Sequence, residues 1–330
     1  MFKRLALSVI AVSLSLGVVT AHADPVVIKF SHVVTDDTPK GKGALLFQKL
    51  VQERLGDKFK VEIAPNSTLY GDADEMEALR TNKVQFIAPS LSKLDTYTKQ
   101  LEVFDLPFLF DDLTAVMRFQ QHDTGQRLLG SMAGNGIVGL AFWNNGMKQF
   151  SANRELRQPT DAKGLSFRIQ ASNIINDQFA LVGATAVRLP FAESFKALQS
   201  GKVQGTENTW SNLYSQKLNT VQPFMTESNH GVLSYMFMTN TTFWNALPFD
   251  TRTKLQAIAD EVTVSVNKDA EAINTANRAM IVSSGTTKIL TLNPADRQAW
   301  RDAMAPLLKT YEAEIGAGVI RAAQAANRKH

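Results

Sequence analysis

The 330-residue sequence contains no cysteine. This absence excludes disulfide bonds, thiol catalysis and every metal site that needs cysteine ligands. The fold must therefore be stabilised by hydrophobic packing, and 44% of the residues are hydrophobic. A chain of this length can bury a sizeable core, and its length predicts about two domains.

Motifs of common enzyme classes are also missing. The histidines are scattered, without a His-Glu-x-x-His motif or a close His/Asp cluster that would bind a metal. No Gly-x-Ser-x-Gly motif of a serine hydrolase occurs. "GKGALLF" lacks the Lys-Ser/Thr ending of a phosphate loop, and the glycines of "GLAFWNNG" have the wrong spacing for a dinucleotide fingerprint. The sequence thus argues against an enzyme and predicts neither a cofactor nor a metal.

Positive charge is not concentrated anywhere in the chain. The formal net charge is +4, and Lys3 and Arg4 supply two of these charges. No cluster of lysines and arginines forms the basic surface that nucleic acids require. We therefore expect no nucleic-acid partner.

The first 23 residues have the pattern of a secretory signal peptide. "MFKR" is a positive start, "LALSVIAVSLSLGVVT" an apolar core and "AHA" a small-residue cleavage signal. We expect cleavage after Ala23 and export of residues 24–330. The alternative is an uncleaved anchor helix, but the apolar run is shorter than the about 20 residues that a span needs.

The N-terminal third predicts alternating strands and helices. Strands are expected at residues 25–33, 58–65 and 84–90, with helices at 44–56 and 73–83. This β-α-β-α-β order favours an α/β fold with a mainly parallel sheet and covering helices. Ligands of such sheets bind beyond the carboxyl ends of the strands.

An internal echo predicts a second unit of the same plan. Residues 75–85 read "EMEALRTNKVQ" and residues 194–204 read "SFKALQSGKVQ". In both, a helix ends at Ala-Leu and Lys-Val-Gln begins a strand, which ends at Ser90 in the first copy and at Thr209 in the second. A chance match of five residues is the alternative. We favour two lobes that direct these strand ends at the same place.

Residues 251–284 contain neither proline nor glycine. A helix of this length would span about 50 Å, more than the width of one lobe, so we expect it to lie across both. The β-branched run "VTVSV" at 262–266 is where a kink or break is expected. We also expect a strand at 231–244. The segment 291–316 is expected to begin with an Asn-Pro-Ala-Asp turn and to continue as an amphipathic helix.

The strand "KGLSFRIQAS" carries a candidate anion receptor. Leu165, Phe167 and Ile169 alternate with polar residues, which predicts a strand with one apolar face and with Arg168 on the other. A guanidinium offers a fork of donors that matches a carboxylate. Inside a cleft it would need an anion, either a ligand or an Asp or Glu of the chain itself.

Other polar or aromatic residues occur at predicted strand ends or turns, where a sheet would gather them. They are His32, Ser90, Trp143, Asn145, Lys148 and Asn208. Each also has an ordinary structural interpretation. His32 is equally compatible with a buried structural histidine, Trp143 with the core and Lys148 with the surface.

Seven segments together resemble the extracytoplasmic solute receptors of TRAP (tripartite ATP-independent periplasmic) transporters. They are "IKFSHVVTDDTPKGKGA", "NSTLYGD", "VFDLPFLFDD", "GLAFWNNGMKQFSANRELR", "KGLSFRIQ", "LPFAESFKALQSGKVQGTENTWSN" and "NHGVLSY". The likeness covers essentially the whole mature chain, in order, and is strongest to the branch that binds four-carbon dicarboxylates. It implies a periplasmic, two-lobed binding protein with a long helix spanning both lobes.

The resemblance also implies domain bounds and partners. We expect lobe I at 24–147 plus about 235–273, and lobe II at 148–234 plus about 274–330. The partners would be a small organic acid and the membrane permease subunits of the transporter, and nothing demands more than a monomer.

The resemblance assigns roles to candidate residues. It implies that Arg168 pairs with a ligand carboxylate and that Asn208 of "TEN" helps to hold it. Lys148 matches the family's basic position, Ser90 ends the "APS" strand and Phe191 matches its pocket aromatic. Two positions depart from the family pattern, because Thr206 replaces a glutamine and Thr209 stands where many relatives have proline.

The expected function is capture of succinate, malate or fumarate by lobe closure. The first lobe would hold the distal carboxylate or hydroxyl through His32, Lys40 and Ser90, with Lys148 near the hinge, and Asn145 is a further candidate contact. Two alternatives stay open. The same receptor class could bind a monocarboxylate, a sugar acid or an aromatic acid, and a periplasmic enzyme could act on such acids.

Overall fold

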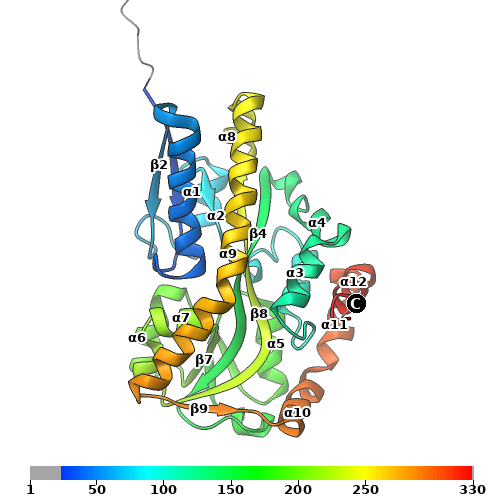
Figure 1. Ribbon diagram of the computed structural model, residues 1–330. Helices are drawn as coiled ribbons and strands as arrows, with labels where there is room; N and C mark the ends of the chain where they lie inside the picture. Colours follow the sequence, from blue (N-terminus) through cyan, green and yellow to red (C-terminus); the bar gives the residue numbers. More distant parts are fainter. Residues whose placement is uncertain (1–23, 329–330) are drawn as a thin grey trace, which may run out of the picture.

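The computed structural model describes residues 24–328, so the predicted signal peptide lies outside the described residues. The chain forms a mixed α/β fold on one continuous sheet (Figure 1). The strands follow the order β2-β1-β3-β8-β4-β7-β5-β6, and β9 pairs with β8. Their bounds are β1 Val26–Ser31, β2 Phe59–Ala64, β3 Phe86–Ile87, β4 Ile137–Ala152, β5 Ser166–Ile169, β6 Thr185–Arg188, β7 Gly205–Asn208, β8 Phe224–Asn240 and β9 Lys288–Thr291.

Two lobes share this sheet. β1, β2 and β3 are parallel and form the sheet of the upper lobe, while β5, β6 and β7 are parallel and form that of the lower lobe. The long antiparallel strands β4 and β8 join the two groups and run through both lobes (Figure 1). The expected parallel strands are therefore present, but the sequence did not predict the antiparallel pair between them.

There is a physical reason why the sequence did not predict strand β4. Most of its 16 residues are buried, so the alternation of polar and apolar residues that reveals a half-exposed strand is missing. Register shifts occur along its pairing with β8, one of them between Asn144 and Gly146. Asparagine and glycine at such a bulge resemble a turn in the sequence.

Helices cover the sheet and connect its strands. Their bounds are α1 Pro39–Leu55, α2 Glu75–Arg80, α3 Leu113–Gln121, α4 Asp123–Leu129, α5 Asn173–Leu181, α6 Ser194–Gln199, α7 Trp210–Ser215, α8 Thr241–Ala246, α9 Phe249–Ser284, α10 Pro294–Met304, α11 Pro306–Ile315 and α12 Ala317–Ala325. Short 3₁₀ turns include residues 91–93 and 100–105. The helices and strands predicted in the N-terminal third are all present, with shifted ends.

Helix α1 begins earlier than expected. The turn-like "TPKGKG" is its first turn, because the Thr38 side chain accepts a hydrogen bond from Gly41 N and Pro39 occupies the first helical position. Gly41 cannot carry a side chain, since a Cβ would lie 2.2 Å from the carbonyl oxygen of Thr35. Lys40 is thereby drawn into the interior, with 1% exposure.

The long helix is present as expected. α9 spans Phe249–Ser284 and ends at Gly285 in the left-handed conformation. It contacts α1 in the upper lobe and α7 in the lower lobe. The helix continues through "VTVSV" without a break, and Figure 1 shows that it changes direction in its second half.

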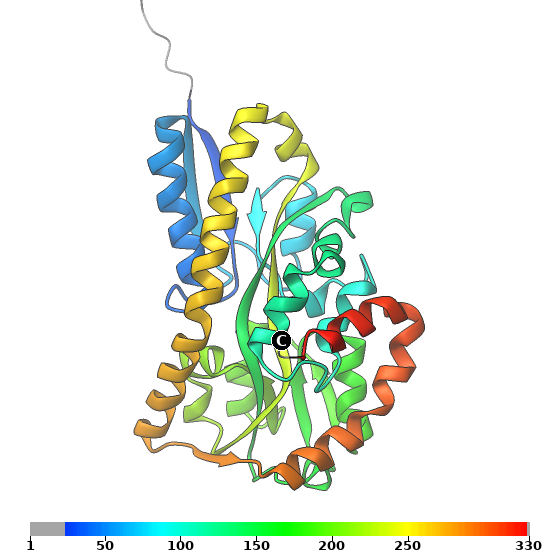
Figure 2. The same ribbon diagram turned by 45° about the vertical axis from the view of Figure 1, so that its right-hand side comes forward.

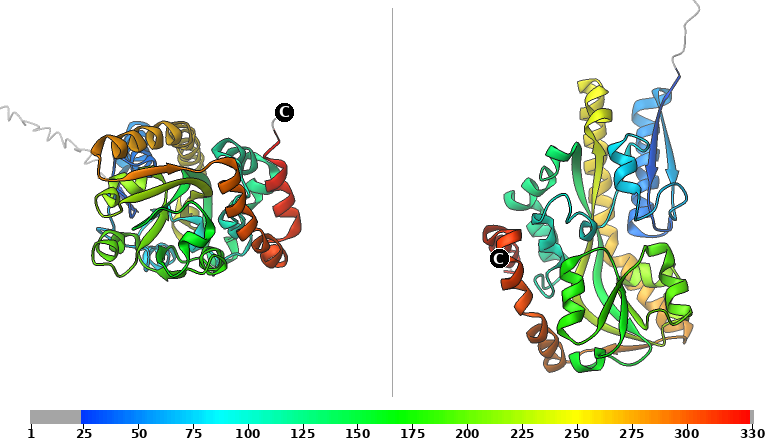
Figure 3. Two further views of the ribbon diagram at one scale, coloured as in Figure 1. Left: turned by 90° about the horizontal axis from the view of Figure 1, so that it is seen from below. Right: turned by 180° about the vertical axis from the view of Figure 1, so that it is seen from behind.

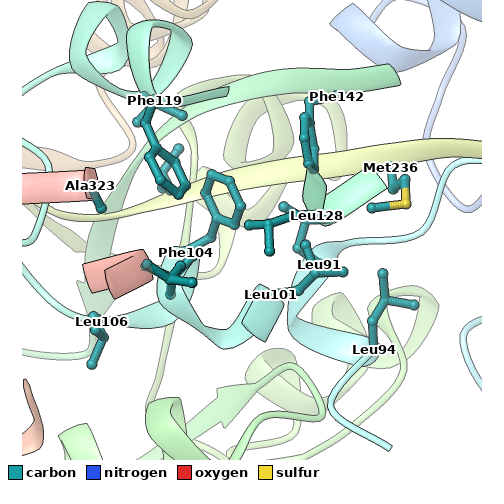
Figure 4. Close-up of a cluster of buried hydrophobic side chains, with 14 of the residues drawn as sticks. Leu91, Leu94, Leu101, Phe104, Leu106, Phe119, Leu128, Phe142, Met236 and Ala323 are labelled. Atoms are coloured by element: carbon teal, nitrogen blue, oxygen red, sulfur yellow. The ribbon is translucent and has the colours of Figure 1, made fainter. Parts of the chain in front are cut away.

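Separate hydrophobic clusters stabilise the two lobes and their junction. One cluster joins α1, β1 and the first half of α9, and two others fill the lower lobe. A further cluster surrounds Phe104 and Phe119, and Figure 4 shows Ala323 of α12 beside these rings. This cluster includes residues of both lobes and fixes the C-terminal helices to residues 101–128.

The C-terminal segment forms three helices along one side of the molecule (Figures 2 and 3). α10 begins after Asn293, whose side chain accepts from Asp296 N, as the Asn-Pro-Ala-Asp turn indicates. The expected single helix is divided at Pro306, which lacks the N–H that would continue α10. The predicted lobe bounds remain a proposal, because the packing of α11 and α12 involves both lobes.

Within residues 24–328, no helix combines the length and the apolar character that a membrane span needs. The same residues contain no group of three or more His, Asp or Glu side chains placed to hold a metal ion. The expectation of no metal and no cofactor stays a prediction.

Candidate functional site

The two strands of the echoed motif end at one cavity between the lobes. β3 leads to Ser90, which bridges to Tyr235 of β8, and β7 ends at Asn208. We call this space the interlobe cavity. Its lining residues are Val33, Val34, Lys40, Asp72, Ser90, Lys93, Arg168, Gln170, Phe191, Asn208, Asn212, Leu233 and Tyr235.

Five of the eight predicted site residues line this cavity, namely Lys40, Ser90, Arg168, Phe191 and Asn208. The first two come from the upper lobe and the other three from the lower lobe. The expectation that both strand ends are directed at the same place is therefore met.

Arg168 lies at the lower-lobe side of the cavity on β5 and is only 2% exposed. Its Nε donates to the carbonyl oxygen of Leu189 at 2.9 Å, and the ring of Phe191 lies 5.6 Å from the guanidinium carbon. Among the described residues, no carboxylate lies within 4.0 Å of its nitrogens. Burial lowers the pKa of Arg168, while the more distant Asp72 and Glu207 act in the opposite direction. The structural ion pair considered for this arginine is thus not formed.

Lys40 provides a second buried cation on the upper-lobe side. Its Nζ donates to the carbonyl oxygen of Ala88 at 3.0 Å and lies 3.9 Å from the centre of the Tyr235 ring. In the described chain, no carboxylate forms an ion pair with it. Burial lowers the pKa of Lys40 to about 7, against a partly opposing effect of Glu75. An anion in the cavity would favour its protonated form.

Two neutral side chains complete the donor set. The oxygen of the Asn208 carboxamide accepts from Thr209 N at 2.9 Å and from Asn212 Nδ2 at 3.0 Å, so its NH₂ group is the part left to donate. The hydroxyl of Ser90 is buried and has no hydrogen-bond partner within residues 24–328. A hydroxyl without a partner is costly in a protein interior unless a ligand or water supplies one.

Sequence reasoning missed an acidic and basic pair at the cavity edge. Asp72 Oδ1 accepts from Lys93 Nζ at 2.5 Å, and Lys93 also bonds to Glu75. Asp72 Oδ2 accepts from the backbone N–H of Phe191 at 2.6 Å, which links the two lobes. Asp72 lies in a loop, and Lys93 in a short turn, so no periodic pattern in the sequence revealed either residue.

Three predicted residues lie outside the lining of the interlobe cavity. Lys148 Nζ contacts both carboxylate oxygens of Glu207, at 3.1 and 3.0 Å, and His230 Nε2 lies 3.5 Å from the same carboxylate. Burial alone would raise the pKa of Glu207, but Lys148 and His230 together lower it. Lys148 is therefore used within the protein, and its contact with a ligand stays a prediction.

His32 and Asn145 are also buried away from the lining. His32 has no hydrogen bond to its ring nitrogens within the described chain, and burial together with the charge of Lys40 lowers its pKa to about 3. Asn145 Nδ2 donates to Thr209 Oγ1 at 2.6 Å, directly behind Asn208. A neutral His32 beside Lys40 and an Asn145 beside the strand end are suited to support the donors of the cavity.

Comparison with known proteins places this chain and its fold among bacterial solute-binding proteins. The family model described as "Bacterial extracellular solute-binding protein, family 7" matches residues 30–314. The chain is 50% identical over 305 residues to the C4-dicarboxylate-binding periplasmic protein DctP of Shewanella loihica, covering 92% of this chain and 91% of that protein. It is 44% identical over 333 residues to the protein of the same name from Vibrio cholerae, covering 100% of both.

Solved structures agree with the sequence relatives. A TRAP periplasmic solute binding protein from Shewanella oneidensis with bound succinate has a TM-score of 0.91 and 52% identity, covering 92% of this chain and 100% of that one. Another from Pseudomonas aeruginosa with bound L-malate has a TM-score of 0.86 and 62% identity, covering 87% and 100%. The overall fold and the arrangement of the lobes are therefore those of these proteins.

Proposed function

Because the chain belongs to family 7 of the bacterial extracellular solute-binding proteins, we propose that it captures a four-carbon dicarboxylate in the interlobe cavity. Relatives that carry the name C4-dicarboxylate-binding protein, and structures with bound succinate and malate, support this ligand class. The observation that carries the proposal is the buried guanidinium of Arg168, which faces a cavity without an ion-pair partner from the described chain.

The donors are divided between the lobes in a way that suits two carboxylates. Arg168 and the NH₂ group of Asn208 would hold one carboxylate from the lower lobe. Lys40 and the hydroxyl of Ser90 would hold the other from the upper lobe. A ligand with a carboxylate at each end would thus satisfy buried groups on both sides at once.

Lobe closure follows from this division. A ligand that contacts both lobes binds the closed state better than the open state, and this differential affinity shifts the population toward closure. The ring of Phe191 lines the cavity beside Arg168 and would exclude water from the bound carboxylate. Excluding water strengthens the charge-assisted hydrogen bonds.

The remaining parts of the proposal concern place and partners. The signal-peptide pattern of residues 1–23 supports cleavage after Ala23 and a periplasmic location. The protein would release its ligand to the membrane permease of a TRAP transporter. We propose a binding protein that leaves its ligand chemically unchanged, since the donors named above hold an anion and none of them forms an acid/base pair.

Isothermal titration calorimetry of the purified mature chain with succinate tests the proposal. Arg168→Ala should weaken binding at least about 30-fold, since losing one partner of a buried charged pair costs about 2 kcal/mol or more. The exposed Arg127 on α4 offers a matched control, and Arg127→Ala should bind like the wild type. Unchanged affinity in a folded Arg168→Ala variant would contradict the proposal. Equal affinity for butyrate and succinate would favour a monocarboxylate receptor instead.

A further inference from the structure

A second hollow adjoins the interlobe cavity. This outer chamber has a volume of about 300 Å³ and is lined in part by Met76, Tyr97 and Arg188. It is open to solvent on one side. Four residues line both spaces and therefore form the partition between them. They are Asp72, Lys93, Arg168 and Gln170.

Within this partition, Asp72 connects the two lobes. Its loop precedes α2 in the upper lobe, whereas Phe191, whose N–H it accepts at 2.6 Å, follows β6 in the lower lobe. Its other oxygen accepts from Lys93, which is held in turn by Glu75. Burial opposes ionisation of Asp72, but Lys93 and the Phe191 N–H outweigh it and lower its pKa to about 2. Asp72 is thus an ionised bridge between the lobes, which we call the crossbar; one carboxylate oxygen is bonded to Lys93 and the other to Phe191 N.

We propose that Asp72 sets the length of the ligand by separating the interlobe cavity from the outer chamber. The inference rests on the proposed function, because it concerns the same ligand site. A six-carbon dicarboxylate anchored at Lys40 and Ser90 would have to extend past Arg168 and place its other end at the partition. There it would meet the bulk of the Asp72 side chain, which the bonds to Lys93 and to Phe191 N hold in place.

The outer chamber is suited to receive a longer ligand once the crossbar is removed. Lys93 stays beside the opening, since Glu75 also holds it. Arg188 also lines the outer chamber and donates to Asn173 Oδ1 at 2.6 Å. A carboxylate that reached through the opening would find these two cations, as well as the apolar side chains of Met76 and Tyr97 for its methylene groups.

Calorimetric titrations with succinate and with adipate, a six-carbon dicarboxylate, test the inference. The wild type should bind adipate at least 100-fold more weakly than succinate. Asp72→Ala should reduce this ratio at least tenfold, although its affinity for succinate also falls because the bond to Phe191 is lost. Asp72→Ser provides a second truncation, and circular dichroism verifies that each variant is folded.

Asp72→Asn is the matched control, because it keeps the size of the side chain and removes its charge. Its ratio should stay within about threefold of the wild-type value, whereas an equal fall in Asp72→Asn and Asp72→Ala would overturn the assignment of a length barrier. An unchanged ratio in both folded truncations would also overturn it. Failure of the wild type to bind succinate would instead refute the proposed function, and the inference with it.

Discussion

From the lowered pKa of the buried Lys40 we predict that ligand binding is accompanied by uptake of a proton. Its Nζ is buried, donates to one backbone carbonyl and has no ion-pair partner in the described chain, and its pKa is lowered to about 7. The difference from the ordinary value of 10.5 corresponds to about 5 kcal/mol by which the fold disfavours the ammonium form. A carboxylate within hydrogen-bond distance would reverse much of this effect and raise the pKa again.

Burial sets the direction of the Lys40 pKa shift, and the charged groups around Lys40 modify it. Glu75 and Asp72 favour its protonation, and Lys93 opposes it. His32 is neutral at this pH, since burial and the charge of Lys40 lower its pKa to about 3. Burial raises the pKa of Glu75, and the Lys40→Gln variant separates the titration of this neighbour from that of Lys40. With a pKa of about 7, the free protein should hold about half a proton on Lys40 at pH 7 and about a tenth at pH 8.

The measurement is calorimetry in two buffers that differ in ionisation enthalpy, such as phosphate and Tris. Binding of succinate should take up about half a proton at pH 7 and about 0.9 at pH 8, and affinity should fall by nearly tenfold for each pH unit above 8. Lys40→Gln should abolish the difference between the buffers. Identical heats in both buffers at pH 8 in the wild type would refute this account of Lys40.

The lowered pKa of Lys40 also makes the free energy of unfolding depend on pH. The folded pKa of Lys40 lies below the unfolded value of 10.5, so the unfolded chain binds more protons between these two values. The contribution of Lys40 to the free energy of unfolding should therefore increase as the pH rises from 7 toward 10.5. Urea denaturation of the wild type and of Lys40→Gln over this range separates it from other groups.

Two further predictions concern the junction of the lobes. Lys148→Met leaves the carboxylate of Glu207 buried without its main partner and should lower the free energy of unfolding by about 3–5 kcal/mol, while Lys196→Met at an exposed position should change it by less than about 0.5 kcal/mol. Urea denaturation measures both variants. An unchanged free energy of unfolding in Lys148→Met would refute the buried-pair interpretation. Gly146→Ala places a Cβ 2.8 Å from Asn274 at a φ of +149° and should destabilise by about 1–3 kcal/mol in the same assay. A wild-type transition midpoint would show that the bulge tolerates a side chain.

Much of the cavity was predictable from local pattern. Alternation around Arg168 marked a strand with one polar residue directed away from the core, and the strand is present at Ser166–Ile169. The echo placed Ser90 and Thr209 at equivalent strand ends, and the structure places Ser90 and Asn208, the residue before Thr209, in the lining of the interlobe cavity. These inferences succeeded because a repeated helix-to-strand connection produces the same geometry twice.

The rest depended on contacts between distant parts of the chain. Asp72 and Phe191 are 119 positions apart, and their hydrogen bond exists only because the two lobes meet. The sequence did not reveal that Lys148 on β4 forms an ion pair with Glu207 of β7. Which of several polar side chains faces a ligand and which faces another side chain is decided by strand register, which periodicity does not reveal.

The bulge of β4 is attached to α9 at two levels. Asn267 accepts from Asn144 N at 2.7 Å and donates to the carbonyl of Phe142. Seven residues further along the helix, Asn274 donates to the carbonyl of Asn145 and accepts from Ser211 N. β4, β8 and α9 all pass from one lobe to the other. Three continuous elements thus connect the lobes. An opening of the lobes would have to bend all three. If the lobes close on a ligand as proposed, closure would therefore change the curvature of α9.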